Sequence, residues 1–140
     1  MKNENLDTDE ILKLIENDLD TDDAKIDFIS QENLRHLLSN AINNAGYSMN
    51  KLAYECSISQ SHLSDFLSNK KNLNRNKLIS IFIVIGYDID NIQKSLICFG
   101  MSPLYPRNMR DFIIMKSIKN GFSLDDINTT LKKEGLEPLC

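Results

Sequence analysis

The sequence contains no tryptophan, and its five glycines are scattered along 140 residues. A glycine-rich phosphate-binding loop is therefore absent, and with it the usual signature of nucleotide-dependent enzymes. No apolar run approaches the roughly 18 residues needed to span a bilayer, and no signal peptide opens the chain. We therefore expect a cytoplasmic protein without a membrane partner.

Cysteine and histidine are also scarce. The three cysteines, Cys56, Cys98 and Cys140, show no C-x-x-C spacing and form no cluster with histidine, so zinc and redox motifs lack support. Cys56 and Cys98 lie among apolar residues, which favours a place in the core. His36 and His62 have no nucleophile at motif spacing. We expect no enzymatic activity, no metal and no cofactor.

The chain has no overall excess of positive charge, since its net charge is −4. The charge is unevenly distributed. Residues 1–30 hold three lysines against ten acidic residues, residues 31–85 hold six basic against three acidic residues, and residues 86–140 hold seven of each. The middle stretch is therefore the only basic one, and it has the charge asymmetry that a nucleic-acid-binding surface needs.

Hydrophobic periodicity and capping residues predict an all-α chain. The run from Ile79 to Ile85 is rich in β-branched residues that favour a strand, but no second run could pair with it, and an orphan strand is not viable. We therefore assign it to a helix. Eight helices are expected, beginning near Asp7, Gln31, Met49, Ser59, Arg75, Asp88, Arg107 and Ser123.

Residues 49–67 fit two short amphipathic helices joined by a tight turn. Ala53 provides the small side chain that steeply crossing helices require, and Leu63 and Phe66 return to the core. This spacing resembles the helix-turn-helix of the Xre/lambda-repressor family of DNA-binding proteins, in the form Leu-Ala-x-x-x-Gly-Ile-Ser-x-x-x-Leu-Ser. Ser57 stands where the family usually has glycine, at a position that often takes a left-handed conformation.

The resemblance implies that the second helix of this motif enters the major groove of DNA. Its outward residues would contact base edges, while helix ends and the following basic loop would contact the backbone. For each of these residues, the alternative is an ordinary solvated surface. The expected base contacts are Gln60, Ser61, His62, Ser64 and Asp65, and the expected backbone contacts are Ser48, Asn50, Ser59, Lys70, Lys71, Asn72 and Arg75.

A second feature lies near the start of the helix expected from Arg107. Arg107 and Arg110 fall in its first turn, where the helix dipole disfavours cations. Pairing of Arg107 with Asp111 at i,i+4 would offset part of that cost, and contact with an anion or an acidic partner is the alternative. This segment, through the closing Gly-Leu-Glu-Pro-Leu, resembles an extension found in a subset of Firmicutes helix-turn-helix proteins.

The sequence thus predicts an acidic helix and linker over residues 1–30, a lambda-repressor-like helix-turn-helix domain over 31–86, and a helical annex over 87–140 packed on it. The expected function is a transcriptional regulator that binds double-stranded DNA as a homodimer on a two-fold operator. The alternative is a helical adaptor that has lost DNA binding. A protein partner could bind the acidic segment or the annex, and the acidic segment could instead cover the basic face and inhibit DNA binding.

Overall fold

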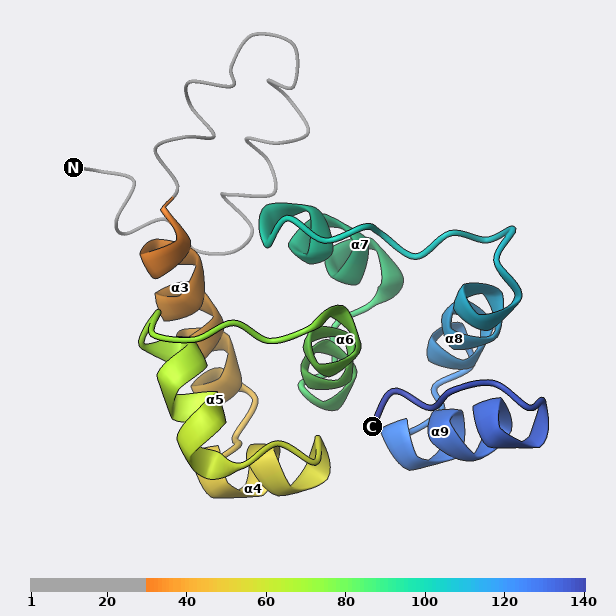
Figure 1. Cartoon of the computed structure of the whole chain (residues 1–140), viewed down its shortest axis with the longest axis horizontal. Helices are drawn as coiled ribbons and strands as arrows, with labels where there is room; N and C mark the ends of the chain where they lie inside the picture. Colours follow the sequence, from red (N-terminus) through yellow and green to blue (C-terminus); the bar gives the residue numbers. More distant parts are fainter. Residues whose placement is uncertain (1–29) are drawn as a thin grey trace, which may run out of the picture.

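A computed structural model describes residues 30–140, and within this range the chain is all-α, with seven helices and no strand. The helix expected after Asp7 and its acidic linker lie outside the described residues. The helices are connected by short loops (Figure 1). In order they are α3 (Gln31–Asn44), α4 (Met49–Glu55), α5 (Gln60–Leu67), α6 (Arg75–Val84), α7 (Ile89–Cys98), α8 (Met109–Lys119) and α9 (Leu124–Lys133).

Each of these helices begins after a polar residue whose side chain accepts a hydrogen bond from a backbone N–H three residues further on. This local chemistry explains why the sequence predicts most helix starts closely. The exception is α8, which begins at Met109 rather than Arg107 because the Asn108 side chain caps it. The seven N-caps are Ser30, Ser48, Ser59, Asn74, Asp88, Asn108 and Ser123.

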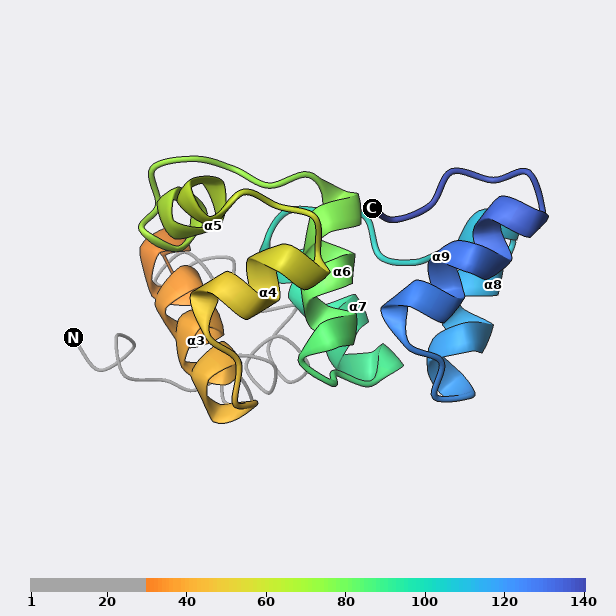
Figure 2. The ribbon, with the colours of Figure 1, turned by 90° about the horizontal axis from the view of Figure 1, so that it is seen from below.

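Helix α6 is confirmed as a helix despite its β-branched sequence. It lies in the middle of the molecule and packs against α4, α7 and α9 (Figures 1 and 2). Ile79, Ile81 and Phe82 have exposed fractions of 0%. A helix surrounded on several sides needs apolar residues around most of its circumference, so burial outweighs the weak preference of isoleucine for strands.

One hydrophobic core runs through the described part of the chain, from Leu38 in α3 to Leu139 near the C-terminus. It crosses residue 86 without interruption. After α7, the Phe99 ring lies 5.9 Å from the Phe66 ring of α5 and 6.4 Å from the Phe82 ring of α6. Helices α8 and α9 pack on the opposite side of α6 from α3 and α5, so they leave the outer face of α5 uncovered (Figures 1 and 2).

The connection between α4 and α5 is a tight turn with Ser57 in the left-handed region, at φ 54°. Ala53 is buried, and its carbonyl accepts a hydrogen bond from the Ile58 N–H at 2.9 Å. The Lys77 ammonium of α6 donates to the carbonyls of Cys56 and Ser57 at 3.2 and 3.0 Å. Lys77 therefore fixes the turn to α6. Helices α4 and α5 cross steeply (Figure 1).

We predict that Ser57→Gly stabilises the protein, because glycine adopts a positive φ without the Cβ strain that serine bears there. The expected gain is about 1 kcal/mol, which raises the midpoint of thermal unfolding by roughly 2–5 °C. Asn69→Gly is the control, because Asn69 also has a positive φ, of 63°, and asparagine tolerates this conformation. Equal shifts for the two variants would contradict the strain assigned to Ser57.

Candidate functional site

The outer face of α5 carries the residues that the sequence singles out. Gln60, Ser61 and Ser64 are exposed, and their side chains have no hydrogen-bond partner among residues 30–140. Leu63 and Phe66 point the other way, into the core. The Ser59 hydroxyl starts the helix by accepting from the His62 N–H at 3.1 Å. Three polar side chains are thus available to a partner on the N-terminal half of α5.

His62 and Asp65, the other two expected base contacts, are engaged within the protein. The His62 ring donates from Nε2 to the Asn72 carbonyl, 2.9 Å away, so this histidine fastens α5 to the loop that follows it. The Asp65 carboxylate lies 3.7 Å from the Lys71 ammonium. The predicted base contact of His62 would therefore have to use its other ring nitrogen, and Asp65 faces a lysine of its own chain.

Arg35 of α3 fixes the loop between α5 and α6, a role that the sequence analysis missed. Its Nη1 donates to the carbonyls of Phe66 at 3.0 Å and Lys71 at 2.7 Å, and Nη2 donates to Asn72 Oδ1 at 3.0 Å. The guanidinium also lies 4.4 Å from the centroid of the Phe66 ring. Arg35 is only 5% exposed, and this burial lowers its pKa. One signal in the sequence was available, namely a charged residue directly after Leu34 on the apolar side of its helix.

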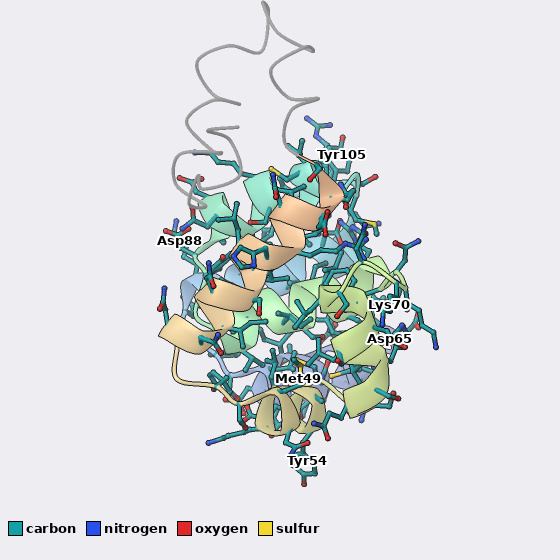
Figure 3. All side chains as sticks on the ribbon, turned by 90° about the vertical axis from the view of Figure 1, so that its left-hand side faces the viewer. Met49, Tyr54, Asp65, Lys70, Asp88 and Tyr105 are labelled. Carbon is teal, nitrogen blue, oxygen red and sulfur yellow. The ribbon has the colours of Figure 1, made fainter. Side chains whose placement is uncertain are left out.

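The remaining expected backbone contacts fall into two groups. Lys70 and Asn50 are exposed and have no side-chain partner in the part of the chain that the structure describes, and Lys71 keeps 61% of its side chain exposed despite its contact with Asp65. Figure 3 shows Lys70 and Asp65 along one edge of the molecule. Asn72 accepts from Arg35 through Oδ1 and from His62 through its carbonyl. Both bonds use acceptor oxygens, so the expected phosphate contact through its Nδ2 stays a prediction.

Arg75 does not belong to this surface either. Its Nε donates to the Ser102 carbonyl at 2.8 Å, and Nη2 donates to the Pro103 carbonyl at 3.0 Å. The same Nη2 lies 3.0 Å from Oδ2 of the buried Asp111. Two carbonyls and a carboxylate thus occupy this guanidinium, so Arg75 joins α6 to the annex instead of contacting a DNA backbone.

The structure also corrects the partner predicted for Arg107. Asp111 accepts from Arg75 and from the Tyr105 N–H at 3.0 Å, while Arg107 is exposed and lies before α8. Arg110 has structural partners, because it donates to the Glu137 carbonyl at 2.7 Å and to Asn76 Oδ1 at 3.0 Å. Of the two arginines proposed to meet an anion or a partner, only Arg107 remains available.

Neither the buried Cys56 nor the half-buried Cys98 is set up for nucleophilic chemistry. Burial raises the pKa of Cys56 to about 12 and that of Cys98 to about 11, so both thiols are protonated at neutral pH. Across residues 30–140, no three His, Cys, Asp or Glu side chains are grouped so that they could hold a metal ion. None of the seven helices is long and apolar enough to cross a membrane.

No protein-family model matches the chain, and no curated protein or solved structure shows significant similarity to it.

We predict that Arg35→Met destabilises the protein by roughly 3 kcal/mol, because it removes the donors to two carbonyls and one side-chain amide in a partly buried site. Chemical denaturation would measure the loss. Arg107→Met is the matched control, because Arg107 is exposed and has no partner in the described residues. A loss no greater for Arg35 than for Arg107 would show that the contacts of Arg35 do not stabilise the fold.

We predict that Arg75→Met costs about 3 kcal/mol of unfolding free energy, because it leaves the Asp111 carboxylate buried without its cation. Replacing both residues, as Arg75→Met with Asp111→Leu, should cost less than the sum of the single changes, because no unpaired charge is then buried. Additive losses in the double-mutant cycle would contradict this pairing.

Proposed function

We propose that α4 and α5 form a helix-turn-helix and that the protein is a sequence-specific DNA-binding transcriptional regulator. The observation that carries the proposal is the free outer face of α5. Gln60, Ser61 and Ser64 are exposed there without partners in residues 30–140, and Lys70 lies exposed in the loop directly after the helix. The left-handed Ser57 and the buried Ala53 support the same assignment, because they allow the steep crossing of the two helices.

The chemistry of these side chains suits base edges in the major groove. Glutamine can donate to and accept from N6 and N7 of adenine at once, and a serine hydroxyl can donate or accept. In helix-turn-helix proteins the N-terminal residues of the second helix make such contacts. Gln60 and Ser61 occupy these first positions of α5, and Ser64 follows one turn later. His62 and Asp65 brace this helix and its loop in our proposal.

In this proposal Lys70, Lys71 and Asn50 contact the DNA backbone. The ion pair of Lys71 with Asp65 is long, at 3.7 Å, and largely exposed, so it contributes little and can be exchanged for a phosphate. The Ser48 and Ser59 hydroxyls accept from the backbone of their own helices, which leaves each hydroxyl proton able to reach a phosphate oxygen.

We further propose that two copies bind one operator. A single recognition helix contacts only a few base pairs, and helix-turn-helix proteins commonly bind two half-sites about 34 Å apart as dimers. The mass of the protein alone and on a selected duplex tests this. Two copies per duplex and a two-fold symmetric site would support the proposal, whereas one copy on an asymmetric site would contradict it.

Salt dependence and two substitutions test DNA binding itself. Affinity for a duplex selected from random sequences should fall steeply with added salt, because binding releases counterions from the DNA. Lys70→Ala should reduce the slope of log affinity against log salt by about 1 and weaken all sequences alike. Gln60→Ala should cost about 1–3 kcal/mol on the selected site and leave the slope unchanged.

Two control variants accompany this experiment. Arg107→Ala removes an exposed arginine of the annex and should leave both affinity and slope near the wild-type values, because Arg107 is remote from α5 in the sequence and lies before α8. Arg75→Ala should lower stability and keep the salt slope, since its guanidinium is occupied within the protein. If Gln60→Ala and Lys70→Ala weaken binding to all sequences equally, that result would contradict a base contact by Gln60.

One observation favours the second candidate function, a protein-binding adaptor. Tyr105, Met109 and Phe112 are large hydrophobic residues that stay exposed on α8 and the loop before it. Met109 is 66% exposed. An adaptor should show no DNA affinity even at low salt, or an affinity that does not change with salt. Replacing Met109 with glutamine would then abolish partner binding, whereas the regulator should keep its DNA affinity.

A further inference from the structure

A cleft separates the end of α4 from the start of α9, on a part of the molecule away from the outer face of α5. Its volume is about 720 Å³, within the range of small-molecule sites. Its lining comes from α4, α6, α9 and the turns beside them. Helix α6 packs against both α4 and α9 (Figure 2). Its walls are Tyr47, Tyr54, Glu55, Ser57, Ile83, Val84, Ser123, Leu124 and Asp125.

The charge of this lining has one sign. Glu55 and Asp125 contribute carboxylates, neither has an ion-pair partner among residues 30–140, and no lysine, arginine or histidine lines the cleft. The pKa of the Tyr47 phenol is raised by burial and by the neighbouring Glu55 carboxylate. This lining would repel an anionic ligand. A neutral ligand would form no ion pair with the two carboxylates.

The end of α6 adds to the negative potential at the cleft. Helix α6 ends there, so the partial negative charge of its carbonyl end faces the cleft. The carbonyls of Cys56 and Ser57 after α4 are bonded to the Lys77 ammonium, which offsets the partial charge of that end. Helix α9 begins there, but Asp125 and Asp126 in its first turn offset the partial positive charge of its N-terminus.

The chain itself places two ammonium groups beside this region. The Lys77 ammonium bonds to the Ser57 carbonyl at 3.0 Å, and the Lys51 ammonium lies 5.7 Å from the centroid of the Tyr47 ring. Neither lysine lines the cleft, and the two contacts show that carbonyl and aromatic groups at its border already attract cations of the chain itself.

Aromatic and aliphatic side chains complete the lining. Tyr54 is 85% exposed, which is unusual for so large a ring, and it projects from the body at the end of α4 (Figure 3). The faces of tyrosine rings attract cations, including quaternary ammonium groups. Ile83, Val84 and Leu124 supply an apolar wall to the same cleft.

We infer that this cleft binds a small organic cation of the alkylammonium class. The charged nitrogen meets the carboxylates of Glu55 and Asp125 and the ring of Tyr54, and the alkyl part lies against Ile83, Val84 and Leu124. This site is separate from the outer face of α5, so the inference does not depend on the proposed DNA binding.

The test uses the full chain and three probes of matched size: n-butylammonium, n-butanol and butyrate. Titration followed by nuclear magnetic resonance should give saturable shifts of the backbone signals of Tyr54, Glu55 and Leu124 with n-butylammonium only. Equal shifts with n-butanol would show that charge plays no part, and saturable binding of butyrate would contradict the sign of the site. The absence of saturable binding by n-butylammonium would also overturn the inference.

Matched substitutions locate the site. Asp125→Asn should weaken n-butylammonium binding about fivefold, the upper range for one exposed charge pair, and Glu55→Gln should act similarly. Asp90→Asn is the control, because Asp90 is the second residue of α7 as Asp125 is the second residue of α9, and it lies outside this cleft. Equal affinities for Asp125→Asn and Asp90→Asn would overturn the assignment, and Glu55→Gln decides the question if Asp125→Asn fails to fold.

Discussion

The central position of α6 is the constraint on which the rest of the described structure depends. Its apolar residues form the middle of a core shared by the α4–α5 pair and the α8–α9 pair, and Ile79, Ile81 and Phe82 are fully buried. Three successive residues of its first turn bond to neighbouring segments. Arg75 binds the loop before α8 and Asp111, Asn76 accepts from Arg110, and Lys77 binds the turn between α4 and α5.

This arrangement divides the basic residues between two tasks. Three of the four arginines in residues 30–140 donate to backbone carbonyls within the protein, namely Arg35, Arg75 and Arg110. The guanidinium has several donors in a fixed plane, so one side chain can satisfy several acceptors at once. The lysines near α5 remain at the surface, apart from Lys77. The proposed DNA-binding surface relies on lysine and on amide or hydroxyl groups, in keeping with the modest positive charge of residues 31–85.

The proposed DNA-binding face and the proposed cation site lie on the same helix pair but on different sides of it. Gln60 and Ser64 belong to the outer face of α5, whereas Tyr54 and Glu55 end α4 beside α9. Because α4 and α5 share one tight turn, a ligand bound at the end of α4 contacts the element that orients α5. The annex thus supplies a wall of the cleft without covering the outer face of α5 (Figures 1 and 2).

Within residues 30–140, the sequence by itself determined the helices, most of their starting residues and the outward side chains of α5, because capping and hydrophobic periodicity act between residues a few positions apart. It also indicated the left-handed position that Ser57 occupies. Only the tertiary structure decided the partners of Arg35, Arg75 and Asp111. Arg35 bonds to residues 31 to 37 positions away, and Arg75 bonds to Asp111 across 36 positions. Such pairings depend on which loops the packed core brings together, and no local pattern in the sequence encodes that choice.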